Sequence, residues 1–431
     1  MRESFIIDGI RIPVGRLAII PTRGCEDLAR EINAWVVSER KNDGVAINVS
    51  EEGIDVHRDI PEDYIIYPDL VRFQTGEGKC VLNDSVRGAD VFIICDVFNR
   101  NATTRFFGED RPMSPDEHFC DLKRIIDAIN GKARRMTVIM PMLYEGRQHR
   151  RTKRESQDCA SALIELTSLG VENIITFDAH DPRVQNAITK HTFEDISTRH
   201  QMIKALNEYG KKEAQAHPEN PLDYKIDPKK LTIISPDEGG LSRAIRYSNV
   251  LHVPLGTFYK RRDYSRTVDG KNPILEHKYL GTQEDIYQKD IVIVDDMISS
   301  GGSILETAKK LKEMGARRIF ACSAFGLYTE GLANFDEAYE AGYITQVFNT
   351  NLVHVTKELL NKPWFTYVSM SKYISFIINY LNTNRSLSSI VDPDPRITKR
   401  LYEKYPEMWA EYLDAKKAQE EAEKINKNTE K

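Results

Sequence analysis

Short apolar runs alternate with helical patterns along most of the chain. Because successive positions in these runs are apolar, we expect strands that are buried on both faces. Helix-length segments separate them, which is typical of parallel sheets covered by helices. The predicted fold class is therefore α/β. The strand candidates are Val91–Cys95, Thr137–Met140, Asn173–Phe177, Leu231–Ile234, Ile291–Val294 and Arg318–Ala324.

Two helices with one apolar face each connect a pair of these strands. They are predicted at Gln157–Leu169 and Ser303–Met314, and a glycine follows each as a stop signal. Each completes a strand–helix–strand unit, and the two units lie in different halves of the chain. We therefore predict two sheet domains, at residues 1–190 and 191–369, rather than one large sheet.

Polar segments interrupt this pattern at four places. Residues 40–63 and 208–230 are interpreted as surface insertions, and residues 261–287 as a long polar loop. Residues 391–431 form a charged C-terminal tail, rich in lysine and glutamate from Lys399 onwards. We expect the tail to be a solvated or partly frayed helix rather than a helix that binds a partner.

Composition and charge exclude several classes of protein. The chain has 431 residues, with 60 Lys and Arg against 65 Asp and Glu, so it has no basic excess for non-specific nucleic-acid binding. No apolar run approaches the roughly 20 residues that span a bilayer, and the N-terminus lacks an apolar signal segment. The six cysteines contain no C-x-x-C pair, which favours reduced core residues over a zinc or redox site. These features predict a cytoplasmic protein.

The most specific motif lies where one buried strand passes into a helix. Two carboxylates end the strand, and two glycines precede the helix, so backbone N–H groups, hydroxyls and the positive helix end converge there. Such a loop binds a phosphate, and the adjacent carboxylates can accept hydrogen bonds from sugar hydroxyls. We therefore predict a phosphorylated ribose as the ligand. The binding residues would be Asp295, Asp296, Ser299, Ser300, Gly301, Gly302 and Ser303.

This loop resembles the phosphoribosyl pyrophosphate signature of the type I phosphoribosyltransferase fold. Five further segments are similar, in the same order, to motifs of the ribose-phosphate pyrophosphokinases, and the chain is identified as a divergent member of that family. The resemblance implies two phosphoribosyltransferase-like domains, with a helix at about 370–390 returning to the first. The five segments are Phe73–Ile94, Pro141–Arg150, Phe177–His180, Ser235–Gly240 and Lys260–Arg262.

The resemblance also implies a reaction. The β,γ-diphosphoryl group of Mg-ATP would pass to the 1-hydroxyl of ribose 5-phosphate, giving 5-phosphoribosyl 1-pyrophosphate and AMP for nucleotide biosynthesis. Lys260 and Arg262 would be the catalytic residues that stabilise the transition state. His180 and Asp237 would hold Mg²⁺, with Asp178 in support. Asp178 and His180 lie two apart, so they project to the same side if the chain stays extended.

The remaining residues implied by the resemblance bind ATP. They are Phe73, Thr75, Gly76, Glu77, Arg147 and Gln148. In relatives the loop at Phe73 reaches the ATP of a neighbouring subunit, which implies a homo-oligomer, dimer-based and built into a hexamer. The other expected partners are ATP and ribose 5-phosphate, and we expect no binding to nucleic acid or to a membrane.

Some positions depart from the family pattern. Ser299 and His149 stand where the pyrophosphokinases have aspartate, and residues 150–158 form a shorter loop than usual. A non-catalytic regulatory paralogue is therefore one alternative. A simple phosphoribosyltransferase is another, although it would explain only the loop at Asp295. An unrelated ATPase is disfavoured because no G-x-x-x-x-G-K-[ST] motif occurs.

Overall fold

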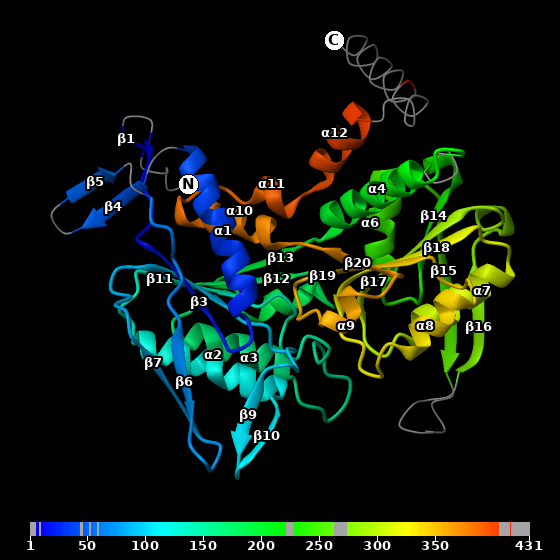
Figure 1. Ribbon diagram of the computed structural model, residues 1–431. Coiled ribbons are helices and arrows are strands. Elements are labelled where there is room, and N and C mark those ends of the chain that lie inside the picture. The colour runs from blue at the N-terminus through cyan, green and yellow to red at the C-terminus, as the bar shows by residue number, and fades with distance from the viewer. Residues whose placement is uncertain are drawn as a thin grey trace, which may run out of the picture.

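The computed structural model describes residues 6–7, 10–43, 46–50, 53–57, 60–220, 227–262, 274–404 and 414, and only the backbone of the strand residues 6–7, 10–11, 46–50, 53–57, 260–262 and 274–277. It contains two mainly parallel sheets flanked by helices, which confirms the predicted α/β class and the two layered domains (Figure 1). All six predicted strands are present. The first sheet has the order β13-β12-β11-β8-β3, with parallel neighbours throughout. Its strands are β3 (Leu17–Pro21), β8 (Asp90–Ile94), β11 (Arg135–Ile139), β12 (Asn173–Phe177) and β13 (Thr192–Ile196).

Helices cover both faces of the first sheet. Val91 and Ile93 of β8 pack on one face, whereas Phe92 and Ile94 pack on the other, as the two-residue period of a strand requires. The first face is covered by α2 (Pro115–Ile129) and α3 (Asp158–Ser168). The second is covered by α1 (Glu26–Asp43) and α10 (Ser371–Asn382), so a helix from near the end of the chain does return to the first sheet.

The second sheet has the order β16-β15-β14-β17-β18-β19-β20, and only the β15–β16 pair is antiparallel. Because β13 pairs with β12, the division between the two sheets falls after Ile196, beyond the expected boundary at residue 190. The strands are β14 (Leu231–Ser235), β15 (Leu255–Arg262), β16 (Ile274–Leu280), β17 (Asp290–Ile298), β18 (Arg318–Gly326), β19 (Gln346–Thr350) and β20 (Phe365–Val368).

Helices also cover both faces of this second sheet. One core joins it to α4 (Arg199–Ala216) and α6 (Leu241–Leu251), and the other to α7 (Gly302–Glu313) and α8 (Ala333–Glu340). Helix α4 extends through the start of the segment at 208–230 that was expected to be an insertion. Two short helices also belong to this part of the chain, α9 (Lys357–Leu360) before β20 and α11 (Ser388–Val391) after α10.

The prediction of a solvated C-terminal tail is wrong for the first part of that tail. Helix α12 (Asp394–Lys404) packs against α4 and α6, and its side chains Ile397 and Leu401 are buried in the core of the second domain. Arg199 of α4 also pairs with Asp394. The lysine-rich composition hid these two apolar positions, which lie four residues apart on one helical face.

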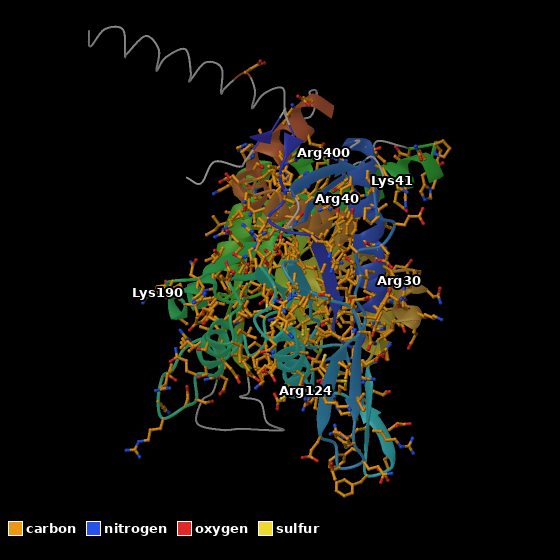
Figure 2. All side chains as sticks on the ribbon, turned by 90° about the vertical axis from the view of Figure 1, so that its left-hand side faces the viewer. Arg30, Arg40, Lys41, Arg124, Lys190 and Arg400 are labelled. Carbon is orange, nitrogen blue, oxygen red and sulfur yellow. The ribbon has the colours of Figure 1, made fainter. Side chains whose placement is uncertain are left out.

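Four two-stranded antiparallel ribbons stand apart from the sheets: β1–β2, β4–β5, β6–β7 and β9–β10. The last two project from the first domain, below Arg124 in Figure 2. A buried carboxylate, Asp121 of α2, anchors the β6–β7 ribbon by pairing with Arg72 of β6 at 2.6 Å, and it also pairs with Arg124 of its own helix at 2.8 Å. The strands are β1 (Ile6–Ile7), β2 (Ile10–Arg11), β4 (Ala46–Ser50), β5 (Gly53–His57), β6 (Pro68–Arg72), β7 (Gly78–Leu82), β9 (Thr103–Phe106) and β10 (Glu109–Pro112).

The structure also bears on two expectations drawn from composition, which concern the cysteines and membrane-spanning segments. All six cysteines are free thiols, and Cys25, Cys95, Cys159 and Cys322 are buried. Among the described helices, none is both long enough and apolar enough to cross a membrane.

Candidate functional site

The loop between β17 and α7 has the form expected of a phosphate site. Gly301 has φ +87°, and a Cβ there would lie 2.3 Å from a ring carbon of Phe335, so the turn requires glycine. A Cβ at Gly302 would meet only the Ser300 hydroxyl oxygen, at 3.9 Å. The space in front of Gly302 is therefore open to a ligand at the N-terminal end of α7, where backbone N–H groups favour an anion.

This loop lines a cavity of about 740 Å³. Arg147 and His180 come to it from the first domain, whereas the other lining residues belong to the second. The cavity thus brings together ten of the residues singled out from the sequence. They are Arg147, His180, Asp237, Asp295, Asp296, Ser299, Ser300, Gly301, Gly302 and Ser303.

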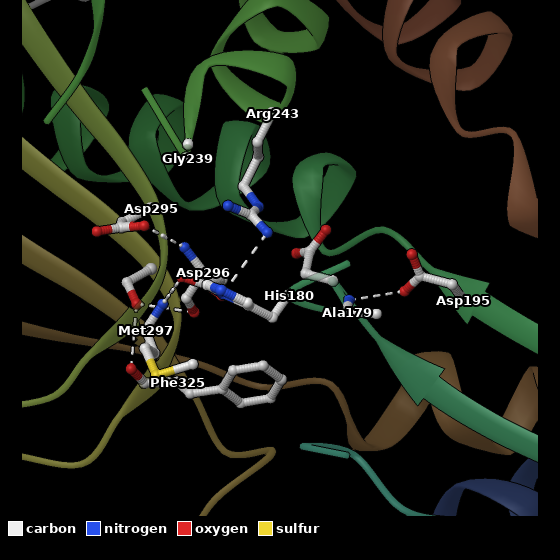
Figure 3. Close-up of polar contacts among 12 residues, drawn as sticks. Ala179, His180, Asp195, Gly239, Arg243, Asp295, Asp296, Met297 and Phe325 are labelled. Atoms are coloured by element: carbon white, nitrogen blue, oxygen red, sulfur yellow. Dashed lines mark hydrogen bonds and ion pairs between the residues drawn. The ribbon is translucent and has the colours of Figure 1, made fainter. Parts of the chain in front are cut away.

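A hydrogen bond joins the two domains inside this cavity. His180, just beyond β12, lies with its Nδ1 2.7 Å from Oδ2 of Asp296 on β17 (Figure 3). Arg243 in the first turn of α6 reaches the same carboxylate, at 4.0 Å. Burial favours the protonated form of Asp296, but His180 and Arg243 outweigh it, so its pKa lies well below the ordinary value.

The neighbouring carboxylate behaves in the opposite way. Burial and the charge of Asp296 raise the pKa of Asp295 well above its ordinary value. Asp295 also accepts a hydrogen bond from the backbone N–H of Asp296, at 2.9 Å. The two adjacent acids are therefore not equivalent, although the sequence motif gives them the same role.

Asp237 is held at the cavity wall by its own loop. Its Oδ1 accepts hydrogen bonds from the backbone N–H groups of Gly239 at 3.0 Å and Gly240 at 3.2 Å. A Cβ at Gly240 would lie 2.8 Å from the Ser235 hydroxyl oxygen, so this tight approach requires glycine. The carboxylate is consequently fixed where it faces the loop at Asp295.

Asp178 does not face this cavity. Its backbone has φ +38°, so the chain does not stay extended, and the expectation that Asp178 and His180 project to the same side is wrong. The Asp178 carboxylate instead accepts hydrogen bonds from the N–H and hydroxyl of Thr198. It lines a separate cavity of about 260 Å³, together with Asp195 and Arg246.

The segment after β11 supplies Arg147 to the cavity and turns its next two residues elsewhere. Gln148 donates a hydrogen bond through Nε2 to the backbone carbonyl of Ser156, at 2.8 Å. His149 lies 3.4 Å from the Asp181 carboxylate, and its ring centre is 5.5 Å from that of His180. Burial lowers the pKa of His149. His149, which replaces the aspartate of the family motif, therefore packs beside the ring of His180 and next to Asp181.

The predicted adenine loop lies at the tip of the β6–β7 ribbon and does not line the cavity. Thr75 donates a hydrogen bond to Glu77 at 2.9 Å, and half of the Phe73 surface is exposed. The tip of the β9–β10 ribbon supports this loop. A Cβ at Gly76 would lie 2.6 Å from the ring of Phe106.

The remaining predicted residues are Lys260 and Arg262. Both are positions of β15, next to β14 in the second sheet. Their side chains lie outside the described part of the structure.

No group of three or more His, Cys, Asp or Glu side chains is arranged to hold a metal ion within the described residues. Mg²⁺, however, usually keeps several waters and binds through one or two carboxylates plus substrate phosphates. The cavity offers such a carboxylate in Asp237, beside an open phosphate loop, and the imidazole of His180 lines the same space as a further donor. These residues fit a magnesium ion that arrives with its substrate.

Sequence reasoning missed Arg243 and Asp195. Arg243 lies three positions after Gly240, within one helical turn of the Asp237 loop, and this spacing could have indicated it. Asp195 accepts a hydrogen bond from the backbone N–H of Ala179 at 2.9 Å, beside His180 (Figure 3). No local signal marks Asp195, because the contact crosses between neighbouring strands.

Comparisons with known proteins agree with this architecture. Residues 18–170 match the N-terminal domain of ribose phosphate pyrophosphokinase, and residues 195–348 match the phosphoribosyl transferase domain. A ribose-phosphate pyrophosphokinase of Vibrio parahaemolyticus is 25% identical over 323 residues, and that of Shewanella oneidensis 27%, each match covering 74% of this chain and 89% of the relative. Phosphoribosylpyrophosphate synthetase from Mycobacterium smegmatis has the same fold. Its crystal structure superposes with a TM-score of 0.62 at 19% identity, covering 86% of this chain and 99% of that one.

Proposed function

Since this chain belongs to the ribose-phosphate pyrophosphokinase family, we propose that it is a ribose-phosphate diphosphokinase. It would transfer the β,γ-diphosphoryl group of ATP to the 1-hydroxyl of ribose 5-phosphate, giving 5-phosphoribosyl 1-pyrophosphate and AMP for nucleotide biosynthesis. One observation carries the proposal. A single cavity joins the phosphate loop of the second domain to Arg147 and His180 of the first.

Ribose 5-phosphate is assigned to the loop of the second domain. Its phosphate would lie against Ser299–Ser303 at the start of α7, in the open space before Gly302. Asp295 is the carboxylate best suited to accept hydrogen bonds from the ribose hydroxyls, since Asp296 is nearly fully buried and bonded to His180. This arrangement would direct the 1-hydroxyl toward the residues from the first domain.

ATP is assigned to the side of the cavity formed by the first domain. Arg147 has the planar guanidinium that grips phosphate oxygens in pairs. Gln148 is held by Ser156 and would position the polar edge of the nucleotide. The adenine loop, Phe73–Glu77, lies on a projecting ribbon away from its own cavity, which supports delivery of the loop to a second copy. We therefore propose a dimer as the minimal active unit, built into a hexamer.

Mg²⁺ would be held by His180 and Asp237. It would supply charge neutralisation between the phosphate oxygens, the main requirement of phosphoryl transfer. Asp178 is left out of this set, because its carboxylate faces Thr198. The positively charged side chains of Lys260 and Arg262 would stabilise the negative charge that develops on the transferred group in the transition state. Their position on β15, beside the strand that leads into Asp237, is consistent with that role.

We assign the activity to the cytoplasm. The six free thiols support a reducing compartment.

The test incubates purified protein with Mg-ATP and ribose 5-phosphate and measures AMP and 5-phosphoribosyl 1-pyrophosphate. We expect equal amounts of both products, and their loss in Lys260→Ala. A folded protein that binds nucleotide and forms neither product, over a range of Mg²⁺ and phosphate concentrations, would contradict the proposal. That outcome would favour the regulatory paralogue.

A further inference from the structure

The hydrogen bond between His180 and Asp296 determines which nitrogen of the imidazole carries the proton. An ionised carboxylate can only accept a hydrogen bond, so Nδ1 of His180 must be the donor across the 2.7 Å contact. In the neutral ring Nε2 then has a free lone pair. This is the nitrogen that a metal-bound imidazole uses when its other nitrogen donates to a carboxylate.

The surroundings of Asp296 fit a supporting role better than a role in ligand binding. Oδ1 accepts from the backbone N–H of Met297 at 2.9 Å, and Oδ2 accepts from His180. The side chain is only 7% exposed, whereas that of His180 is 40% exposed. The guanidinium of Arg243, whose side chain is 15% exposed, lies 4.0 Å from Oδ2 and compensates the charge. Asp296 is thus committed to protein contacts, while Asp295 is partly exposed to the cavity.

The backbone around His180 is fixed by two further carboxylates. Asp195 accepts from the N–H of Ala179 at 2.9 Å, and Asp178 accepts from the N–H of Thr198 at 3.1 Å. These contacts hold the loop from the first domain, and Asp296 holds the ring from the second. The position of the imidazole therefore depends on both domains (Figure 3).

We propose that Asp296 is a positioning residue that fixes His180 in the Nδ1-protonated tautomer with Nε2 free for a metal ion, and is not itself a contact of the ribose. The metal part rests on the proposed function. The tautomer part does not, because it concerns the free protein.

The experiment compares Asp296→Ala with the matched variant Asp295→Ala in three measurements. Nitrogen-15 NMR of histidine-labelled, metal-free protein gives the tautomer of His180, whose signal is assigned by its loss in His180→Gln. Electron paramagnetic resonance gives the affinity for Mn²⁺ in the presence of ATP. Calorimetry gives the affinity for ribose 5-phosphate alone.

We expect Asp296→Ala to abolish the Nδ1-protonated signal and weaken Mn²⁺ binding 10- to 100-fold, with less than threefold change for ribose 5-phosphate. Asp295→Ala should keep the tautomer and weaken ribose 5-phosphate binding at least tenfold. Asp296→Asn, which retains an acceptor oxygen, should restore part of both properties and serves if the alanine variant does not fold.

Two results would overturn the proposal. One is a wild-type His180 protonated on Nε2, and the other is a loss of ribose 5-phosphate binding in Asp296→Ala equal to that in Asp295→Ala. If the protein forms no product although His180 has the expected tautomer, the proposed reaction fails and the positioning of the ring by Asp296 stands.

Discussion

Two adjacent glycines of the phosphate loop serve different purposes, and substitution should separate them. Gly302→Ala places a methyl group in the open space before α7, so we expect the KM for ribose 5-phosphate to rise at least tenfold with an unchanged melting temperature. Gly301→Ala forces a Cβ against Phe335 at a positive φ, and should lower the free energy of unfolding by about 1–3 kcal/mol. Steady-state kinetics and thermal denaturation measure the two effects. Equal destabilisation by both variants would contradict this division.

Asp195 should make stability depend on pH. Burial raises its pKa from 3.8 to about 6, and the hydrogen bond from Ala179 opposes that rise only in part. The folded state binds the proton of the Asp195 carboxyl more tightly than the unfolded state does. The contribution of this group to the free energy of unfolding is therefore complete below about pH 4 and is lost as the pH rises through 6.

Asp195→Asn stays neutral at every pH and keeps an acceptor for Ala179. We expect the variant to be more stable than the wild type by up to about 3 kcal/mol at pH 7.5, with no difference at pH 4. Urea denaturation at the two pH values measures this difference. A gain of the same size at both values would show that the ionisation of Asp195 is not its cause.

Residues within one continuous motif were the easiest to predict. The order Asp295 to Ser303 fixes a strand end, a turn and a helix start, so local geometry alone brings these residues to one point. The prediction for Asp178 was wrong because this residue adopts a positive φ. Nothing in the sequence indicates that conformation for an aspartate two positions before a histidine. The pairing of Asp296 with His180 was equally invisible, since it joins two domains.

At the scale of elements, the β9–β10 ribbon supports the predicted adenine loop. Phe106 lies directly against Gly76, and the backbone N–H of Phe107 donates to the carbonyl of Gln74 at 2.9 Å. We expect Phe106→Ala to raise the KM for ATP several-fold, because the loop loses this support, and to leave the KM for ribose 5-phosphate unchanged.

Phe107→Ala is the matched control for that experiment. Its ring is 74% exposed, so the variant removes an aromatic side chain from the same tip without removing the contact with Gly76. Kinetics with each substrate varied in turn measure the effect. A KM for ATP that is the same in Phe106→Ala and the wild type would contradict the supporting role.

Buried parallel strands were predictable as elements, whereas the ribbons and α12 were not. Ile291–Val294 is apolar at every position because helices cover both faces of its sheet, and this pattern survives without any alignment. The β9–β10 ribbon is largely exposed and the β6–β7 ribbon is half-buried at alternate positions, so neither carries such a continuous apolar pattern. Among the side chains of α12 that the structure describes, Ile397 and Leu401 are the fully buried apolar ones amid many charges, too few to distinguish the helix from a solvated one.

For the whole molecule, docking of α12 should contribute measurably to stability. Leu401 is 1% exposed and packs in the core of the second domain. Leu401→Ala should lower the free energy of unfolding by about 2–5 kcal/mol, the usual cost of removing a buried leucine. Lys399 on the same helix has a side chain that is 73% exposed, so Lys399→Ala should change the free energy of unfolding by less than about 0.5 kcal/mol. Chemical denaturation of both variants distinguishes a docked helix from a solvated one, for which the two losses would be alike.

The return of α10 to the first domain has a consequence for the order of events during protein synthesis. One face of the first sheet is covered by α1 and α10 together, yet α10 begins only at Ser371, long after the last strand of that sheet ends at Ile196. A ribosome adding roughly 5–20 residues per second needs about 10–35 seconds to cover that interval. During this time apolar side chains such as Phe92 and Ile94 lack part of their cover. The first domain to leave the ribosome is therefore among the last parts of the chain to complete its core, and holding chaperones have their natural target there.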